Sequence, residues 1–529
     1  MSESSVPASE PDPRRWGGLA VLSLALFLVV TGNIALAVAM REVASETGAT
    51  SSELQWMLDA YPLTMAALLF AFGALGDKIG RRAALLWGMA GFGVFSVLGG
   101  LGDSPEHLIA ARTGLGIAGA LIMPATLGLV RMIFPEEERS RALALWSASA
   151  GLGLAFGPML GGALVEVWGW EAAFYLNVPV VVVLFVAAIP LLPATRDRDT
   201  GKLDPLGALL SCLTLGSLVF GFIEGPSKGW TSVEVLGAWA LSLIALVLFI
   251  VTERRVAEPM VDLNWFSNRH FAAGAGFAVL ALTVSIGMIY LITLHAQQFS
   301  GQGPLDTGLR LLPAGIGILL AVPVGERIYH RVGARWAIVP GLLLGAAGAY
   351  ALSTVDLSST DTPVIVAGVL VGLGTGLAIP SMTDSVMSNA PKERSGVAGG
   401  AFDASIEVGA SLGIAVFGSV LTSVYASELP DALMAELPPE ARDIAEDSLG
   451  GATILAQQAP PEVAGQMLEA ARSAFIDGMN ASSLTIVCLA GLTAVLGLFL
   501  IPGRSGHPTP RQTDPEGQPG NGAGMTRAS

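Results

Sequence analysis

Four ionisable side chains lie inside long apolar stretches of the sequence: Asp59, Arg112, Asp403 and Glu407. A charge in such a stretch is costly unless it faces a cavity or a partner, so each is a candidate for function. Asp403 and Glu407 are four residues apart, which places both carboxyl groups on one face of a helix. Two like charges in a partly desolvated site favour holding a proton at neutral pH and releasing it when a cation arrives. We therefore expect proton coupling and substrate binding at these residues.

Each candidate also has an interpretation without function. The three acids could be interfacial or belong to internal ion pairs, and Arg112 could extend to a membrane surface from about one turn inside. Depth distinguishes the two late acids. From a helix start near residue 396, a rise of 1.5 Å per residue puts Asp403 about 10 Å deep and Glu407 about 16 Å deep. Glu407 is therefore expected near the middle of a bilayer.

The elements that carry these residues are predicted to be membrane-spanning helices. Hydrophobic residues make up 52% of the chain and charged residues only 13%, whereas a soluble domain has about 25% charged residues. The apolar residues form blocks of about 20, the length that crosses a hydrocarbon core of about 30 Å. The expected spans are 17–40, 55–76, 83–101, 107–132, 141–165, 172–192, 205–224, 234–252, 271–295, 306–325, 336–354, 363–387, 396–425 and 476–502. The predicted fold class is all-α integral membrane, with about 14 transmembrane helices.

The Lys and Arg residues predict the orientation, because the loops between spans that are rich in these residues stay in the cytoplasm. Of the 28 Lys and Arg residues, about 22 fall on the side of the N-terminus. Both termini are therefore expected to be cytoplasmic, with a short N-terminal segment at 1–16 and a disordered tail at 503–529. The acidic, Ala-rich segment 426–474, in which stretches such as 462–472 suggest short helices, is expected outside the cell.

Composition argues against several other classes of protein. Cys212 and Cys488 lie far apart in apolar blocks, so neither a disulfide framework nor a metal site is expected. We find no nucleotide-binding loop or nucleophile elbow, and hence expect no cofactor and no enzyme activity. The absence of a basic patch outside the joints argues against nucleic-acid binding. We expect a monomer surrounded by lipid.

A first motif lies between the second and third spans, in Gly73-Ala-Leu-Gly-Asp77-Lys-Ile-Gly80-Arg81-Arg82. The glycines allow a tight turn, and the arginines hold the joint at an anionic membrane face. The alternative interpretation is an ordinary glycine turn with positive charge. A second motif, Leu108-Ile-Ala-Ala-Arg112-Thr-Gly-Leu-Gly116 continuing to Pro124, contains Arg112 in the fourth span.

A third motif in the fifth span contains four glycines and a proline: Gly153, Gly157, Pro158, Gly161 and Gly162. Small residues at a spacing of four let helix backbones approach closely, and a proline can bend a helix. This helix is therefore expected to pack tightly against its neighbours.

Together the motifs resemble those of the major facilitator superfamily. The joints Trp168-Gly-Trp170 and Asp204-Pro-Leu-Gly207 are similar to those of its fourteen-helix drug:proton antiporter branch, which includes multidrug and quaternary-ammonium exporters. The resemblance implies two six-helix bundles, at 17–192 and 271–502, with an inserted helix pair at 205–252. It also implies that Asp77 braces the helix start at Ser395-Gly396 of the other half.

The resemblance implies further that Arg112 lies near the proton path and that the Gly157-Pro158 pattern marks exporters. The expected activity is proton-coupled antiport that exports organic cationic or amphipathic drugs and biocides across the bacterial plasma membrane. Alternatives are a dedicated exporter of an endogenous metabolite or antibiotic, a proton-coupled importer, and a non-transporting membrane sensor of the same fold.

Substrate contacts are expected from residues that offer apolar surface, amide groups or aromatic faces to a cation. The candidates are Asn33, Trp56, Tyr61, Met288 and Tyr290. One departure affects the stoichiometry: Leu28 stands where the branch usually places an aspartate in its first helix. The resemblance therefore does not predict how many protons move per substrate.

Overall fold

The structure is a computed structural model, and it describes residues 13–49, 51–194, 204–256, 259–357, 360–391, 394–430, 434, 437–457 and 460–502. These residues are helical or form short joints, and they contain no strand. The expected tail at 503–529 and most of the segment 1–16 lie outside the described residues.

The helices consist of long ones, which follow the predicted spans, and a few short ones. They are α1 (Arg15–Thr47), α2 (Ser51–Ile79), α3 (Arg81–Gly100), α4 (Pro105–Ile133), α5 (Glu136–Trp168), α6 (Ala172–Tyr175), α7 (Asn177–Leu191), α8 (Pro205–Lys228), α9 (Val233–Glu253), α10 (Arg269–Leu294), α11 (Pro304–Val332), α12 (Arg335–Leu352), α13 (Thr362–Met387), α14 (Ser395–Glu428), α16 (Pro439–Asp447), α17 (Leu449–Ala456) and α18 (Pro461–Leu500). A 3-10 turn, η1 (Leu263–Ser267), precedes α10, and a π-helical segment, η2 (His295–Phe299), extends it.

Among the described residues, 13 segments are long and apolar enough to cross a membrane. The 33-residue helix α5 would be the fourteenth. One expectation is wrong: residues 462–472 are not a separate short helix but the beginning of α18, which runs for 40 residues. The reason is that this Ala-rich stretch is a good helix former and continues into the last span without an interrupting proline.

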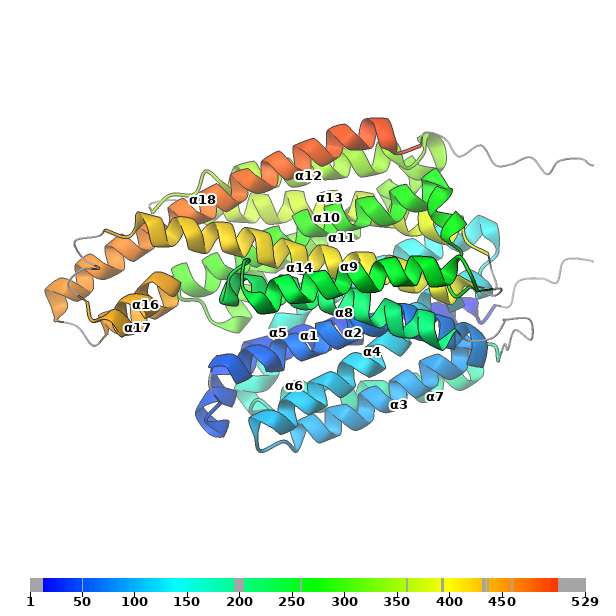
Figure 1. The fold of residues 1–529 in the computed structure, drawn as a ribbon, viewed down its shortest axis with the longest axis horizontal. Coiled ribbons are helices and arrows are strands. Elements are labelled where there is room, and N and C mark those ends of the chain that lie inside the picture. The colour runs from blue at the N-terminus through cyan, green and yellow to red at the C-terminus, as the bar shows by residue number, and fades with distance from the viewer. Residues whose placement is uncertain are drawn as a thin grey trace, which may run out of the picture.

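The helices form two groups with an inserted pair between them (Figure 1). Helices α1 to α7 make the first half, and α10 to α18 make the second. The halves contact each other through α5 against α11 and through α2 against α14, while α8 contacts both α2 and α14. We call the end where α1 begins and α18 ends the terminal face, and the end that carries α16 and α17 the distal face.

Local sequence signals set the helix boundaries. Gly80 has a φ of 99° and separates α2 from α3, a conformation that glycine adopts without strain. Asp204 caps α8, accepting hydrogen bonds from the backbone N–H groups of Leu206 and Gly207 at 3.1 and 2.9 Å.

The outer surface of the bundle is apolar, as a lipid environment requires. Trp87 of α3 is 70% exposed and Leu243 of α9 is 62% exposed, and many other large apolar side chains share this surface. A contiguous apolar surface of this extent is not found on soluble monomers. The protein is a multi-pass membrane protein.

Candidate functional site

A cavity of about 1020 Å³ lies between the two halves. Helices α1, α2, α4 and α5 line it from the first half, and α10, α11, α13 and α14 line it from the second. Helix α8 also contributes, and so does α16 through Glu446. The lining reaches the distal ends of α10 and α14, so the cavity belongs to the distal part of the interface.

The charge of the lining has a single sign. Three lining residues are acidic, Asp59, Glu407 and Glu446, and none of the lining residues is Lys, Arg or His. Aromatic side chains come from both halves and from α8. They are Tyr61, Trp146, Phe222, Tyr290 and Phe402. Carboxylates beside aromatic faces attract organic cations by Coulomb and cation–π interactions.

The two acids of α14 differ in their surroundings. Glu407 is partly exposed and lines the cavity. Asp403 is fully buried, and neither of its carboxyl oxygens has a hydrogen-bond partner among the described residues. The two groups interact electrostatically, as their four-residue spacing predicts. Only Glu407, however, can meet a molecule in the cavity directly.

Arg112 joins three helices of the first half. It is fully buried in α4, and it donates from Nε to the carbonyl oxygen of Met57 at 2.9 Å and from Nη1 to that of Gly32 at 3.0 Å. Its guanidinium lies over the ring of Tyr61, 4.7 Å from the centroid. The burial rules out the interpretation that Arg112 extends to the membrane surface. Asp59 interacts with it electrostatically from the cavity side.

The five predicted substrate contacts fall into three groups. Tyr61 and Tyr290 line the cavity. Trp56 packs against Phe220 of α8, with ring centroids 6.1 Å apart, and is not a lining residue. The expectation that Met288 contacts substrate is wrong. Met288 is fully buried in the core of the second half, because its face of α10 points away from the cavity. The side chain of Asn33 lies outside the described ones.

The first motif connects the halves at the terminal face. Asp77 accepts hydrogen bonds from the backbone N–H groups of Gly396 at 2.9 Å and Val397 at 3.1 Å, at the start of α14. Arg81 holds the same carboxylate, with Nε 2.8 Å from Oδ1. The expected contact between Asp77 and this helix start is therefore present. The positive end of a helix stabilises a carboxylate in this position.

Close backbone packing accompanies this contact. A methyl group on Gly73 would lie 2.5 Å from the carbonyl oxygen of Gly396, so only glycine fits there. Arg131 of α4 adds a second connection, donating to the carbonyl oxygen of Ala390 at 2.5 Å. We call these contacts of Asp77, Arg81 and Arg131 the terminal latch. Arg82 instead stays within the first half and donates to the carbonyl oxygen of Ile189.

The glycine motif of α5 packs against α1. A methyl group on Gly153 would lie 3.0 Å from the side chain of Val30. Gly157, Gly161 and Gly162 are also buried, and the side chain of Pro158 lies outside the described ones. The motif therefore lets two helices of the first half approach closely, as its spacing predicts.

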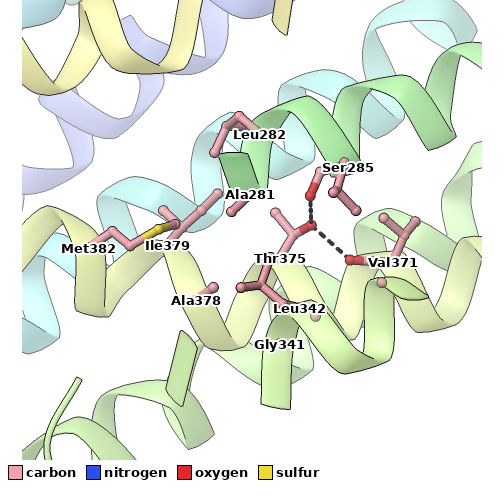
Figure 2. A pocket seen from close by; sticks show the side chains of 13 residues that line it. Ala281, Leu282, Ser285, Gly341, Leu342, Val371, Thr375, Ala378, Ile379 and Met382 are labelled. Atoms are coloured by element: carbon pink, nitrogen blue, oxygen red, sulfur yellow. Dashed lines mark hydrogen bonds between the residues drawn. The ribbon is translucent and has the colours of Figure 1, made fainter. Parts of the chain in front are cut away.

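A polar pair that the sequence motifs do not include lies at the edge of the cavity. Ser285 of α10 and Thr375 of α13 are hydrogen-bonded through their hydroxyl oxygens at 2.7 Å (Figure 2). Both line the cavity and also a small apolar pocket behind it. Hydroxyl residues inside apolar spans are a signal that could have identified them. Glu446 and Phe222 are further lining residues that were not predicted.

Comparison with known proteins places this arrangement in a family. The sequence profile of the Major Facilitator Superfamily matches residues 22–414. The chain belongs to the major facilitator superfamily. As a major facilitator it is a membrane transporter and not an enzyme. The match covers most of the first half, the inserted pair and the second half as far as the middle of α14.

Several curated relatives of this major facilitator match over most of their length. The "Tetracenomycin C resistance and export protein" of Streptomyces glaucescens is 33% identical over 93% of each chain. The "Multidrug efflux pump LfrA" of Mycolicibacterium smegmatis is 33% identical over 94% of this chain and 98% of the relative. The "Methyl viologen resistance protein SmvA" of Salmonella typhimurium is 32% identical over 88% and 93%.

Solved structures share the fold at low sequence identity. The human organic anion transporter MFSD10 superposes with a TM-score of 0.58 at 15% identity, over 93% of this chain and 100% of that one. A bacterial homologue of the human lysosomal transporter Spinster, in an inward-facing and unoccupied conformation, superposes with a TM-score of 0.54 at 18% identity, over 92% and 98%.

Proposed function

We propose that this protein is a proton-coupled antiporter that exports organic cations and amphipathic compounds across the bacterial plasma membrane. The terminal face would be cytoplasmic, with both termini inside. The observation that carries the proposal is the cavity, whose lining combines three carboxyl groups with aromatic faces and contains no basic side chain. The names of the relatives, which refer to resistance, export and efflux, support the same function.

Glu407 is the proposed coupling residue. An ionised Glu407 attracts an organic cation, and a proton that binds there removes this attraction, so the two ligands compete for one group. In the conformation described here the residue faces the distal side, where it would receive a proton from outside and release the exported compound. In the opposite conformation a cation from the cytoplasm would displace the proton. Asp403, one helical turn away and fully buried, is a candidate second proton site.

The terminal latch fits the expected change of access. Its contacts hold α2 against the start of α14, and α4 against the joint between α13 and α14, at the terminal face, while the cavity lies toward the distal face. Transporters of paired-bundle architecture change access by rocking one half against the other around a fixed site. Breaking the latch would open the cytoplasmic side.

The membrane potential supplies enough free energy to export a neutral substrate. At about 2.3 kcal/mol per 100 mV, one proton that enters at about 150 mV supplies about 3.5 kcal/mol. This sustains a gradient of roughly several hundredfold for a neutral substrate. A substrate that carries charge changes this value, since its own movement also works against the membrane potential.

The test measures internal pH in proteoliposomes that hold the purified protein and a preset proton gradient, while organic cations are added. We expect cation-triggered proton movement in the parent protein and none in Glu407→Gln, because the amide retains the shape but cannot ionise. The control is Asp103→Asn, whose side chain is 94% exposed in the joint before α4. Full proton movement in Glu407→Gln would overturn the coupling site.

A second candidate is a dedicated exporter of an endogenous compound. It is favoured by the relative whose name refers to tetracenomycin C export. The same assay separates the two candidates, because a dedicated exporter would respond to one compound class only. No response to any compound would favour a non-transporting protein of this fold.

A further inference from the structure

The inserted pair α8–α9 takes part in the cavity rather than only covering the bundle. Phe222, Ile223 and Pro226, all near the distal end of α8, are lining residues. Helix α8 contacts α2 of one half and α14 of the other, and it lies between the halves in Figure 1. It therefore separates the distal part of the cavity from the lipid on this side.

The need for such a wall follows from how α2 and α14 pack. Toward the terminal face they touch directly, since a methyl group on Gly400 would lie 2.7 Å from the carbonyl oxygen of Leu69. Farther along, Asp59 of α2 and Thr422 of α14 both line the cavity, so the helices stand apart there. Helix α8 fills the space between their distal parts.

Contacts to both halves hold α8 in this position. On the α2 side, Phe220 packs against Trp56. On the α14 side, the indole of Trp230, in the joint between α8 and α9, donates to the hydroxyl oxygen of Ser419 at 3.1 Å. Gly418, the neighbour of Ser419, lines the cavity. The wall is thus anchored next to the site on both sides.

The ring of Phe222 is held by an aromatic cluster. Its centroid lies 5.8 Å from that of Trp239 in α9, and Trp239 stacks on Trp230 at 5.8 Å. Trp239 also lies directly on the backbone at Gly221, where a side chain would collide with its indole. A side chain fixed in this way presents a defined surface to the cavity, because little rotamer entropy remains to be lost on binding.

We propose that α8 is a wall of the substrate cavity and that Phe222 is a specificity-determining residue, favouring flat aromatic cations. This inference rests on the proposed function for its substrate class. Its physical basis is ring stacking and cation–π attraction, which a cation without rings cannot fully exploit. Trp146 of α5 and Tyr290 of α10 line the same cavity as Phe222, so a flat ligand could meet aromatic faces from several helices.

The first test is thiol labelling of single-cysteine variants, made in a background in which Cys212 and Cys488 are replaced by alanine. The variants are Phe222→Cys and, as a matched control on the same helix, Leu213→Cys, because Leu213 is exposed on the outer side of α8 and does not line the cavity. Purified protein in nanodiscs is treated with a charged, water-soluble maleimide. We expect Phe222→Cys to react severalfold faster and a saturating concentration of ethidium to protect it. Equal labelling of the two variants, or labelling of Phe222→Cys that ethidium does not slow, would contradict the proposal that α8 forms a wall of the substrate cavity.

The second test compares binding of two cations to the full chain, ethidium with its fused rings and tetrapropylammonium without rings. In Phe222→Ala we expect the Kd of ethidium to rise about fivefold, with little change for tetrapropylammonium. Phe222→Tyr should restore the ethidium affinity, and Leu213→Ala, at an exposed position of α8 outside the cavity lining, should leave both values unchanged. An equal change for both cations, or none, would overturn the role of Phe222.

Neither measurement needs proton coupling. If the antiport hypothesis fails, labelling and binding still report on the wall. If the proposed role of Phe222 is contradicted, the pH assay of Glu407→Gln still reports on proton coupling.

Discussion

At the residue scale, Arg112 shows how a charge becomes tolerable inside the bundle. The guanidinium donates to main-chain carbonyl groups of α1 and α2 and lies over the ring of Tyr61. The hydroxyl of Tyr61 in turn donates to the carbonyl oxygen of Val29 at 3.0 Å. Arg112 therefore positions α1, α2 and Tyr61, one of the cavity residues.

We predict that Arg112→Ala lowers the thermal stability of the protein by several degrees. The substitution removes several charge-assisted hydrogen bonds, each worth about 1.5–3 kcal/mol. It also takes the donor from the carbonyl group of Leu58, which receives none from its own helix because Pro62 has no N–H group. Arg112→Lys should recover only part of the loss, since an ammonium group cannot reproduce the planar fork of donors. The measurement is thermal unfolding in detergent. Arg255→Ala, at an exposed position, is the control, and an unchanged Tm for Arg112→Ala would contradict the structural role.

At the scale of elements, the terminal latch depends on the close crossing of α2 and α14. Glycine at residues 73 and 396 brings the two backbones together, and Asp77 then reaches the free N–H groups at the start of α14. The loop motif and the late helix are more than 300 residues apart in sequence. In the conformation described here their contact closes the terminal face.

We predict that Gly396→Val shifts the protein toward a conformation that is open at the terminal face. A β-carbon at this residue would lie 2.5 Å from the carbonyl oxygen of Gly73 and 2.6 Å from Oδ1 of Asp77, so the closed crossing cannot form. The measurement is electron–electron double resonance between spin labels at Glu137 and Val332, two exposed terminal-face residues of different halves. We expect a longer distance to appear in the distance distribution.

A matched control is Gly276→Val in α10. No neighbouring atom lies within 4 Å of an added β-carbon at Gly276. Its distance distribution should equal that of the parent protein. An unchanged distribution in Gly396→Val would show that the crossing does not control access.

At the scale of the whole molecule, the closed latch and the distal cavity together define one accessible side. The lining extends to Thr422 of α14 and Glu446 of α16, both near the distal face. The segment 426–474 is therefore more than a connection between spans, since it contributes Glu446 to the lining, where Arg442 pairs with the carboxylate at 2.6 Å. The carboxyl groups of Asp59 and Glu407 deeper in the cavity favour the entry of cations and protons from the distal side.

We predict that a membrane-impermeant thiol reagent added to intact cells labels Thr422→Cys in the cysteine-free background. Glu137→Cys, exposed at the terminal face, should react only after the cells are opened, because that face is expected in the cytoplasm. The measurement is a gel-shift assay with a bulky maleimide. The reverse pattern would invert the predicted orientation.

The sequence by itself determined the elements and most of the candidate chemistry, because both are properties of the local chain. Apolar blocks of membrane length predicted the long helices, and Asp59, Arg112 and Glu407 stood out as charges within these blocks. The motif around Asp77 predicted its contact with the start of α14 through resemblance to a family. Each of these signals is present in a short stretch of residues.

Only the tertiary structure decided which side chains meet. Asp403 and Glu407 lie on nearly the same face of α14, yet one is buried and the other lines the cavity. Four residues turn a helix by about 40° more than a full circle, so the neighbouring helices decide which acid they cover. Packing likewise placed Met288 in the core and brought Phe222 to the cavity. Such outcomes depend on neighbours hundreds of residues away, which no local pattern specifies.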